Sequence, residues 1–187
     1  MQHDGYAKLF RGAVEKSKAL GLLQGPDPSV QVPPDAGFAL GALSTIGRAV
    51  NSYPYAYEDI RVQCAAIHLT LYDDPRWDAP CILTVGDVEV DGKLEYDTSY
   101  EGLDEELRGV RRHAKEISPC HVWLTFPDLH IVDVTFFVYR YHDRVPSPFT
   151  WSEYLICSDA RHPFAVDLPL RYVPMLIGRD AIVPLVM

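Results

Sequence analysis

Three residues of this chain have the side-chain types needed for nucleophilic catalysis: Cys64, His121 and Asp133. A carboxylate beside a histidine fixes the tautomer of the ring and stabilises the imidazolium that forms when the ring accepts a proton. A thiol becomes the attacking group once it has lost its proton. The sequence therefore predicts a Cys-His-Asp triad that forms a thioester, in acyl transfer or in amide or ester hydrolysis.

His121 and Asp133 belong to one predicted β-hairpin over residues 120–139. Two runs rich in Val, Ile, Thr and aromatic residues flank residues 126–129, where a Pro presets φ and an Asp can bond its own backbone. An even number of positions separates His121 from Asp133. A loop of odd length, such as a three-residue turn, would put both on one face of the sheet, and an even loop without a bulge would separate them.

The order of these motifs along the chain carries a family resemblance. Cys64 on a predicted helix is followed by Leu83-Thr-Val-Gly86, then by His121-Val-Trp-Leu, then by Ile131-Val-Asp133-Val-Thr. This order resembles the transglutaminase-like branch of the papain-like cysteine enzymes, in which the His has a His-x-Trp context and the Asp an Asp-x-Thr context. The resemblance covers about residues 59–139 and implies catalytic roles for Cys64, His121 and Asp133. The family often carries Gly where this chain has Leu129.

Two further residues are candidates for lining the site. Gln63 could supply a side-chain donor near the thiolate, although a Gln at such a position more often faces solvent. Trp123 would flank the cleft. Backbone N–H groups near Cys64 would hold the oxyanion.

Metal sites are poorly supported by the residue spacing. A zinc site of Cys120, His121 and His130 is disfavoured because adjacent strand residues point to opposite faces and no ligand pair has the usual spacing. The acidic residues 104–106 are typical of a solvated helix surface. We therefore expect no metal and no organic cofactor.

Each candidate also has a structural interpretation. Cys64 shares one predicted helical face with the residues Ile60, Ile67, His68 and Leu71. On such a stripe a Cys is most often a small core residue. His121 and Asp133 could equally be satisfied polar groups at strand ends, and His68 a surface or packing residue. The chain would then be a non-catalytic binding module on the same fold, with the aromatic residues of 53–57 and the cleft beside Trp123 as its anchors.

Helical patterns come first in this chain and strand patterns follow, which predicts an α+β fold. Helices are expected at residues 4–23, 35–50, 59–72 and 101–116. Strands are expected at residues 81–85, 87–96 with a turn at 91–92, 120–139, 149–157, 170–177 and 181–186. The N-terminal helices, including the Cys64 helix, should pack on one face of a mainly antiparallel sheet, as a papain-like or transglutaminase-like core. Residues 131–139 should form a central strand, and Pro174 and Pro184 should lie in edge strands.

Length and composition indicate a single folded domain. The 187 residues divide into a helical N-terminal segment (1–58), a candidate catalytic core (59–139) and additional strands (140–187). A formal net charge of −9 argues against nucleic acid or an anionic membrane as the main partner. The four cysteines form no CxxC pair and no secretory signal is seen, which favours reduced thiols in a cytoplasm. The expected partner is a peptide, amide or small acyl substrate, and the oligomeric state stays open.

Overall fold

The structure is a computed structural model, and it describes residues 2–23, 60–73, 81–109, 120–127, 129, 131–133, 135–136, 155–156 and 170–186. Side chains are described for these residues except 2–4, 60–64, 155–156 and 185–186. Within these ranges no helix combines the length and the apolar character that a membrane span requires. The predicted helix at 35–50 lies outside the described residues.

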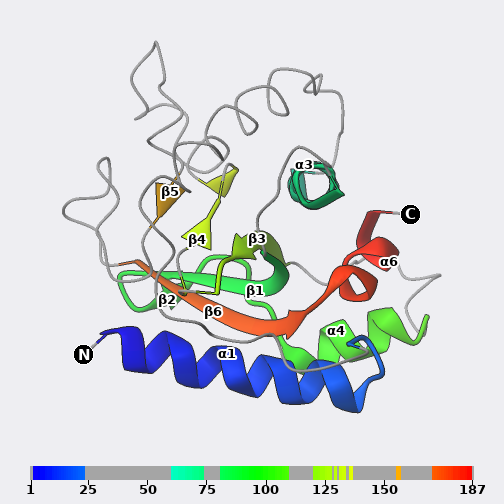
Figure 1. Ribbon diagram of the computed structural model, residues 1–187, viewed down its shortest axis with the longest axis horizontal. Helices are drawn as coiled ribbons and strands as arrows, with labels where there is room; N and C mark the ends of the chain where they lie inside the picture. The colour runs from blue at the N-terminus through cyan, green and yellow to red at the C-terminus, as the bar shows by residue number, and fades with distance from the viewer. Residues whose placement is uncertain are drawn as a thin grey trace, which may run out of the picture.

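An antiparallel sheet forms the centre of the fold (Figure 1). Its strands are β1 (Ile82–Val90), β2 (Lys93–Leu94), β3 (His121–Thr125), β4 (Ile131–Val132), β5 (Leu155–Ile156) and β6 (Leu170–Ile177). β1 pairs with β2, β3 and β6, then β3 pairs with β4 and β4 with β5. Every one of these pairings is antiparallel, so the predicted mixture of helices with a mainly antiparallel sheet is confirmed.

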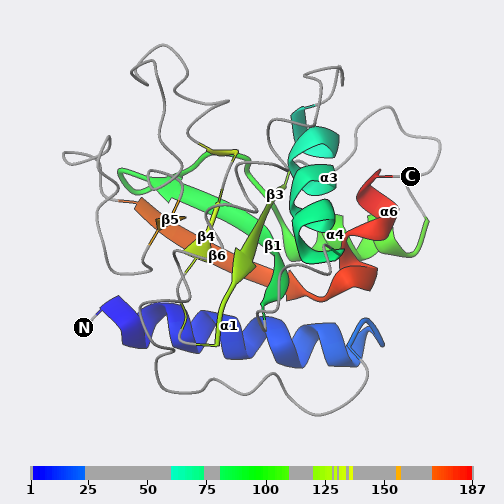
Figure 2. The same ribbon diagram turned by 45° about the horizontal axis from the view of Figure 1, so that its top comes forward.

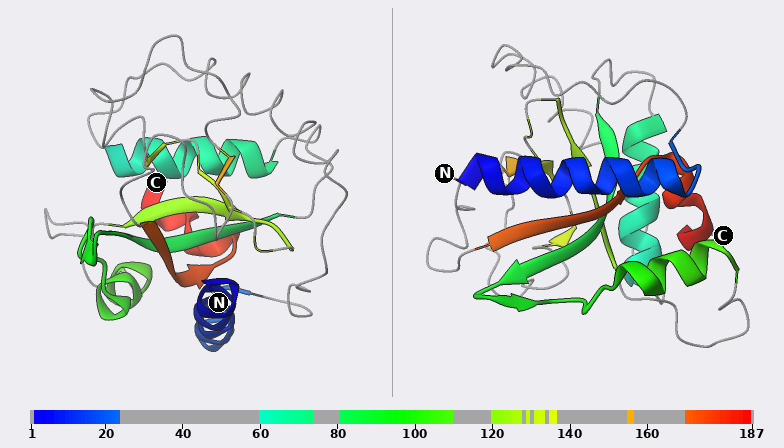
Figure 3. Two further views of the ribbon diagram at one scale, coloured as in Figure 1. Left: turned by 90° about the vertical axis from the view of Figure 1, so that its left-hand side faces the viewer. Right: turned by 90° about the horizontal axis from the view of Figure 1, so that it is seen from below.

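Helices cover both faces of this sheet. Helix α1 (Gln2–Ala19) runs along β6 on one face, and helix α3 (Ile60–Asp73) crosses β3 on the other (Figures 2 and 3). The prediction that the N-terminal helices share one face was therefore wrong. The reason lies in the strands: every residue of β3 is buried, and a strand that is buried on both sides needs a cover on each.

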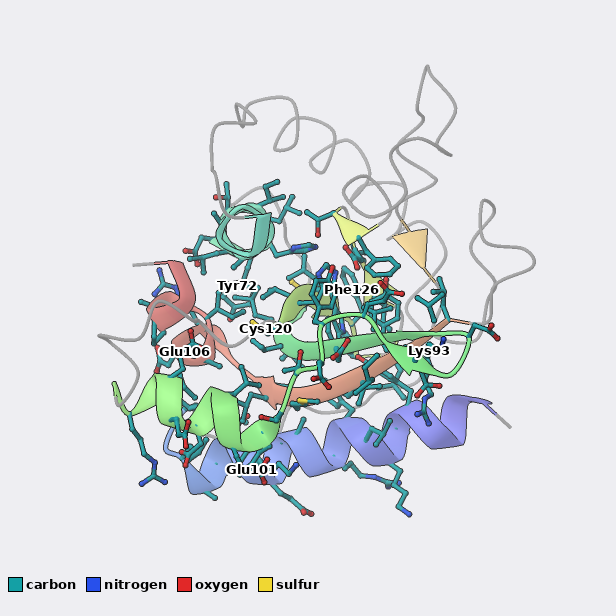
Figure 4. All side chains as sticks on the ribbon, turned by 180° about the vertical axis from the view of Figure 1, so that it is seen from behind. Tyr72, Lys93, Glu101, Glu106, Cys120 and Phe126 are labelled. Carbon is teal, nitrogen blue, oxygen red and sulfur yellow. The ribbon has the colours of Figure 1, made fainter. Side chains whose placement is uncertain are left out.

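The apolar side chains form two clusters, one on each side of the sheet. Along β3 they alternate, with Val122 and Leu124 in the cluster beneath α3 and Trp123 in the cluster above α1. Cys120 and Phe126, at the two ends of β3, belong to the α3 cluster (Figure 4). Helix α4 (Tyr100–Leu107) lies beside α1, where the Lys16 ammonium is 4.4 Å from the centre of the Tyr100 ring.

Two helices have ends that differ from the predicted ones. α1 spans Gln2–Ala19, so it begins two residues before the predicted start at residue 4. α4 is capped by the Ser99 hydroxyl, which accepts a hydrogen bond from the N–H of Gly102 at 3.0 Å. It ends at Leu107, short of the predicted residue 116, and Gly109 at φ 70° supplies the left-handed residue that commonly follows a helix.

β1 is one long strand, where the sequence predicted a break at Gly86. It continues to Val90, and its register against β6 shifts between Val85 and Gly86, as in a β-bulge. The turn that follows, Asp91-Gly92, has φ values of 49° and 76°. Two consecutive positive φ values are typical of a type I′ hairpin turn, so this predicted turn is confirmed.

The predicted strand at 131–139 is much shorter in the structure. β4 ends at Val132 because the Asp133 side chain accepts hydrogen bonds from the backbone N–H groups of Thr135 and Phe136, which diverts the chain from the sheet. β4 lies between β3 and β5, and β1 is the strand with the most partners. The expected place of this strand inside the sheet, with a neighbour on each side, is confirmed, but its expected length was wrong. Residues 137–139 lie outside the described part of the chain.

The two predicted edge strands had different outcomes. Pro174 lies in β6, which among the described strands pairs with β1 alone, so this edge position is confirmed. Residues 181–186 do not form a strand. They belong to the 3-10 helix η3 (Arg179–Ala181) and to helix α6 (Val183–Val186), and Pro184 falls in the first turn of α6, where a missing N–H costs nothing.

We expect Gly86→Ala to destabilise the protein by about 3 kcal/mol. A Cβ at this position would lie 2.0 Å from the carbonyl oxygen of Val173 and 2.9 Å from the Trp123 ring, and the backbone of β6 cannot give way at the bulge. Urea denaturation measures the change. Gly12→Ala in α1 is the matched control, because its Cβ meets nothing within 4 Å and the exchange should stabilise the helix by about 0.5–1 kcal/mol. Equal stability changes in the two variants would contradict this account of Gly86.

Candidate active site

The two ionisable residues of the predicted hairpin lie at its open end. His121 is the first residue of β3 and Asp133 directly follows β4, and antiparallel pairing puts these positions at the same end of the sheet. The loop between the strands spans residues 126–130, an odd number, which places both side chains on one face. Leu129 in this loop has φ 66°, the left-handed conformation that Gly adopts most easily.

His121 and Asp133 form a short, buried hydrogen bond. Nε2 of His121 lies 2.6 Å from Oδ2 of Asp133, and each residue is about 1% exposed. An ionised carboxylate can only accept, so in the neutral ring Nε2 carries the hydrogen. Nδ1 is then the ring nitrogen that can take a proton from a nucleophile.

The Asp133 carboxylate accepts several further hydrogen bonds. Oδ1 accepts from the N–H and the hydroxyl of Thr135, at 2.9 and 3.1 Å, and from the N–H of Phe136 at 3.0 Å. Oδ2 accepts from the hydroxyl of Tyr172 at 2.9 Å. Burial alone raises the pKa of Asp133, but the charge and hydrogen bond of His121, the charge of His68 and the Phe136 N–H outweigh it and hold the pKa far below its usual value. The carboxylate is therefore ionised in the folded protein.

Aromatic rings surround His121. The Tyr96 ring stacks on it nearly parallel, at 5.2 Å between centroids, and the Phe136 ring meets it edge-on at 5.6 Å. Trp123 also lies against it, at 6.1 Å. The Trp123 N–H donates to the Tyr6 hydroxyl at 3.0 Å and the residue is fully buried. Trp123 therefore packs against His121 inside the protein and is not the wall of an open cleft, which corrects the predicted binding surface beside it.

His68 is a part of the site that sequence reasoning missed. It was assigned to the surface or to packing, yet it is fully buried, with Nε2 at 3.9 Å from Oδ1 of Asp133 and its ring 6.5 Å from that of His121. The available signal was its position in α3, one helical turn after Cys64. Tyr172 and Tyr96 were missed as well, and no local pattern in the sequence marks them.

The remaining predicted site residues lie in α3. Cys64 and Gln63 are helical residues of α3, and their side chains are outside the described part of the structure. Cys81 and Cys120 are buried in the cluster beneath α3. Among the described residues, no group of three His, Cys, Asp or Glu is arranged to hold a metal ion.

We expect the Asp133 carboxyl to titrate well below the ordinary Asp value of about 3.9. A depressed folded-state pKa contributes stability that is fully present above the unfolded value and is lost as the pH falls toward the folded one. Carboxyl-detected NMR measures the midpoint directly, with the signal assigned by its disappearance in Asp133→Asn. A midpoint at or above that of an unfolded Asp would contradict the hydrogen-bond network.

Comparisons with protein-family models, with curated proteins and with solved structures find no match for this chain.

Proposed function

We propose that this protein is a cysteine-dependent acyltransferase or amide or ester hydrolase, with Cys64 as nucleophile, His121 as general base and then acid, and Asp133 as the group that orients His121. The observation that carries the proposal is the 2.6 Å hydrogen bond between His121 and an ionised, buried Asp133, beside the helix that contains Cys64. A transglutaminase-like or papain-like core is part of the proposal, since α3 covers an antiparallel sheet that carries His121 and Asp133 at one end.

The position of α3 supports Cys64 as the nucleophile. His68, from the same helix, approaches the Asp133 carboxylate to 3.9 Å. Position 64 is one turn earlier, and positions four apart on a helix are neighbours on one face, with Cβ atoms about 6 Å apart. Residue 64 is thus within one helical turn of a side chain that contacts the pair.

The reaction follows from the roles of the two ring nitrogens. Nδ1 of His121 takes the thiol proton, and the Cys64 thiolate attacks the carbonyl carbon of the substrate. As the tetrahedral intermediate collapses, the imidazolium gives its proton to the departing amine or alcohol and a thioester remains. Water or an acceptor amine then loses a proton to His121 and attacks the thioester, which regenerates the thiol when the product leaves. Asp133 keeps its negative charge throughout and stabilises the imidazolium at each stage.

The substrate class follows from this chemistry. A thioester intermediate requires an acyl donor, so a peptide, an amide or a small acyl compound fits the site. The thiol must be reduced to react, which fits the cytoplasmic location that the sequence predicts.

A second candidate function is favoured by the burial of the pair. His121 and Asp133 are almost completely shielded from solvent, and a fully satisfied buried network can serve to specify the fold. The protein would then be a binding module on the same scaffold, and Cys64 would be an inert core thiol.

Alkylation by iodoacetamide with peptide mapping separates the two candidates. An ordinary thiol near pKa 8.5 is only a few per cent thiolate at pH 7, so a Cys64–His121 pair should react about tenfold faster than the buried Cys81 and Cys120. His121→Gln keeps an N–H that can reach Asp133 but cannot accept the thiol proton. We expect this variant to lower the Cys64 rate about tenfold.

Thr84→Val is the matched control for lost stability. It removes a buried hydroxyl whose described side-chain partner is Thr125 Oγ1, at 2.8 Å, and should leave Cys64 reactivity unchanged. Labelling of Cys64 at the rate of Cys81, with no effect of His121→Gln, would exclude the enzyme and leave the binding module.

A further inference from the structure

The Asp133 oxygen that binds His121 is shared with a residue from a distant strand. Tyr172 lies in β6, is 4% exposed, and donates its hydroxyl to Oδ2 of Asp133 at 2.9 Å. The same oxygen accepts from Nε2 of His121 at 2.6 Å. The Tyr172 ring is already held by an edge-on contact with Trp123 at 5.1 Å, which a Phe would also make. The Tyr172 hydroxyl is therefore not needed for this packing, and its contribution is the hydrogen bond to Asp133.

We infer that Tyr172 is a positioning residue of the proposed active site, whose hydroxyl fixes the Asp133 carboxylate and limits its basicity so that the shared proton stays on His121. The catalytic role of Tyr172 rests on the proposed function. The effect of its hydroxyl on the titration of His121 can be measured in the protein without any substrate.

The geometry supports both parts of this role. Thr135 and Phe136 hold Oδ1, and Tyr172 and His121 hold Oδ2, so donors at both oxygens prevent the carboxylate from rotating. A donor on the oxygen that faces His121 also withdraws negative charge from that oxygen. The carboxylate then attracts the His121 proton less strongly than a carboxylate whose Oδ2 bonds His121 alone.

Burial keeps the Tyr172 hydroxyl protonated. Its removal from solvent raises the pKa of Tyr172 well above the ordinary value, and the charge and hydrogen bond of Asp133 raise it further. Tyr172 is therefore a hydrogen-bond donor at every pH at which the protein would work.

Four titratable side chains of the described elements contact His121 or its partner Asp133. They are Asp133 after β4, Tyr172 in β6, His68 in α3 and Tyr96 after β2. Of these, the first two meet at a single oxygen atom. A change at Tyr172 should therefore reach His121 through Asp133.

The test is the NMR titration midpoint of the His121 ring in the full chain, assigned by the loss of its signal in His121→Gln. Tyr172→Phe keeps the ring contact with Trp123 and removes the hydroxyl. The midpoint should rise by about 0.5–1 pH unit, because a more basic carboxylate stabilises the imidazolium more strongly. Replacing Tyr172 by 3-fluorotyrosine, a stronger donor, should shift it downward. The opposite signs keep the test valid even if one variant folds poorly.

Tyr6→Phe is the matched control. Tyr6 is also a buried tyrosine, with its hydroxyl 2.8 Å from Thr125 Oγ1 and 3.0 Å from the Trp123 N–H, and it does not touch Asp133 in the structure. It should lower stability and leave the His121 midpoint in place. An unchanged midpoint in both Tyr172 variants, or an equal shift in Tyr6→Phe, would overturn the positioning role.

This outcome is independent of Cys64. If iodoacetamide finds Cys64 inert but the midpoint moves as stated, the electrostatic link holds and the proposed enzyme fails. If Cys64 is reactive and the midpoint does not move, the enzyme stands without Tyr172 as a positioning residue.

Discussion

The arrangement at this end of the molecule depends on one buried negative charge. An ionised carboxylate removed from water is strongly unfavourable unless hydrogen-bond donors replace its hydration. For Asp133 the donors come from three places: its own turn at Thr135 and Phe136, the start of β3 at His121, and the distant strand β6 at Tyr172. β4 ends just before Asp133, and β3 and β6 lie where His121 and Tyr172 can donate hydrogen bonds to this carboxylate.

Strand β1 supports the site although it contributes no group to the Asp133 network. Gly86 pairs with His121, and the bulge at Gly86 lets β6 and Trp123 come so close that no side chain fits there. The next residue, Asp87, is buried and accepts hydrogen bonds from the N–H groups of Tyr96 and Thr98. These bonds hold the segment whose Tyr96 ring stacks on His121. β1 therefore determines both the position of β6, which carries Tyr172, and the position of the Tyr96 ring that stacks on His121.

The burial of the pair has two opposite effects on the proposed chemistry. Exclusion of water strengthens the interaction between the carboxylate and an imidazolium, since the local dielectric constant is low. It also means that the substrate must approach from the side of the nucleophile and not through the histidine. Helix α3 is the element that meets this requirement, because it carries Cys64 and contacts Asp133 through His68.

Features that depend on residues close together in the chain are predictable from the sequence alone. The Asp91-Gly92 turn, helix α3 and strand β6 follow from local conformational preference and from periodicity. The sequence left open whether the loop between His121 and Asp133 is odd or even, and only the structure shows the odd loop of residues 126–130 that brings the two side chains to one face. Other features depend on contacts between distant parts of the chain, which such local patterns do not report. The apolar run after Ile131 has high strand propensity, yet the bonds from Asp133 to its own backbone end the strand, and residues 181–186 became helical once packed at the end of α3. Tyr172 and His68 reach Asp133 across 39 and 65 residues of sequence, because contacts at such separations are set by which faces must be buried together and not by spacing along the chain.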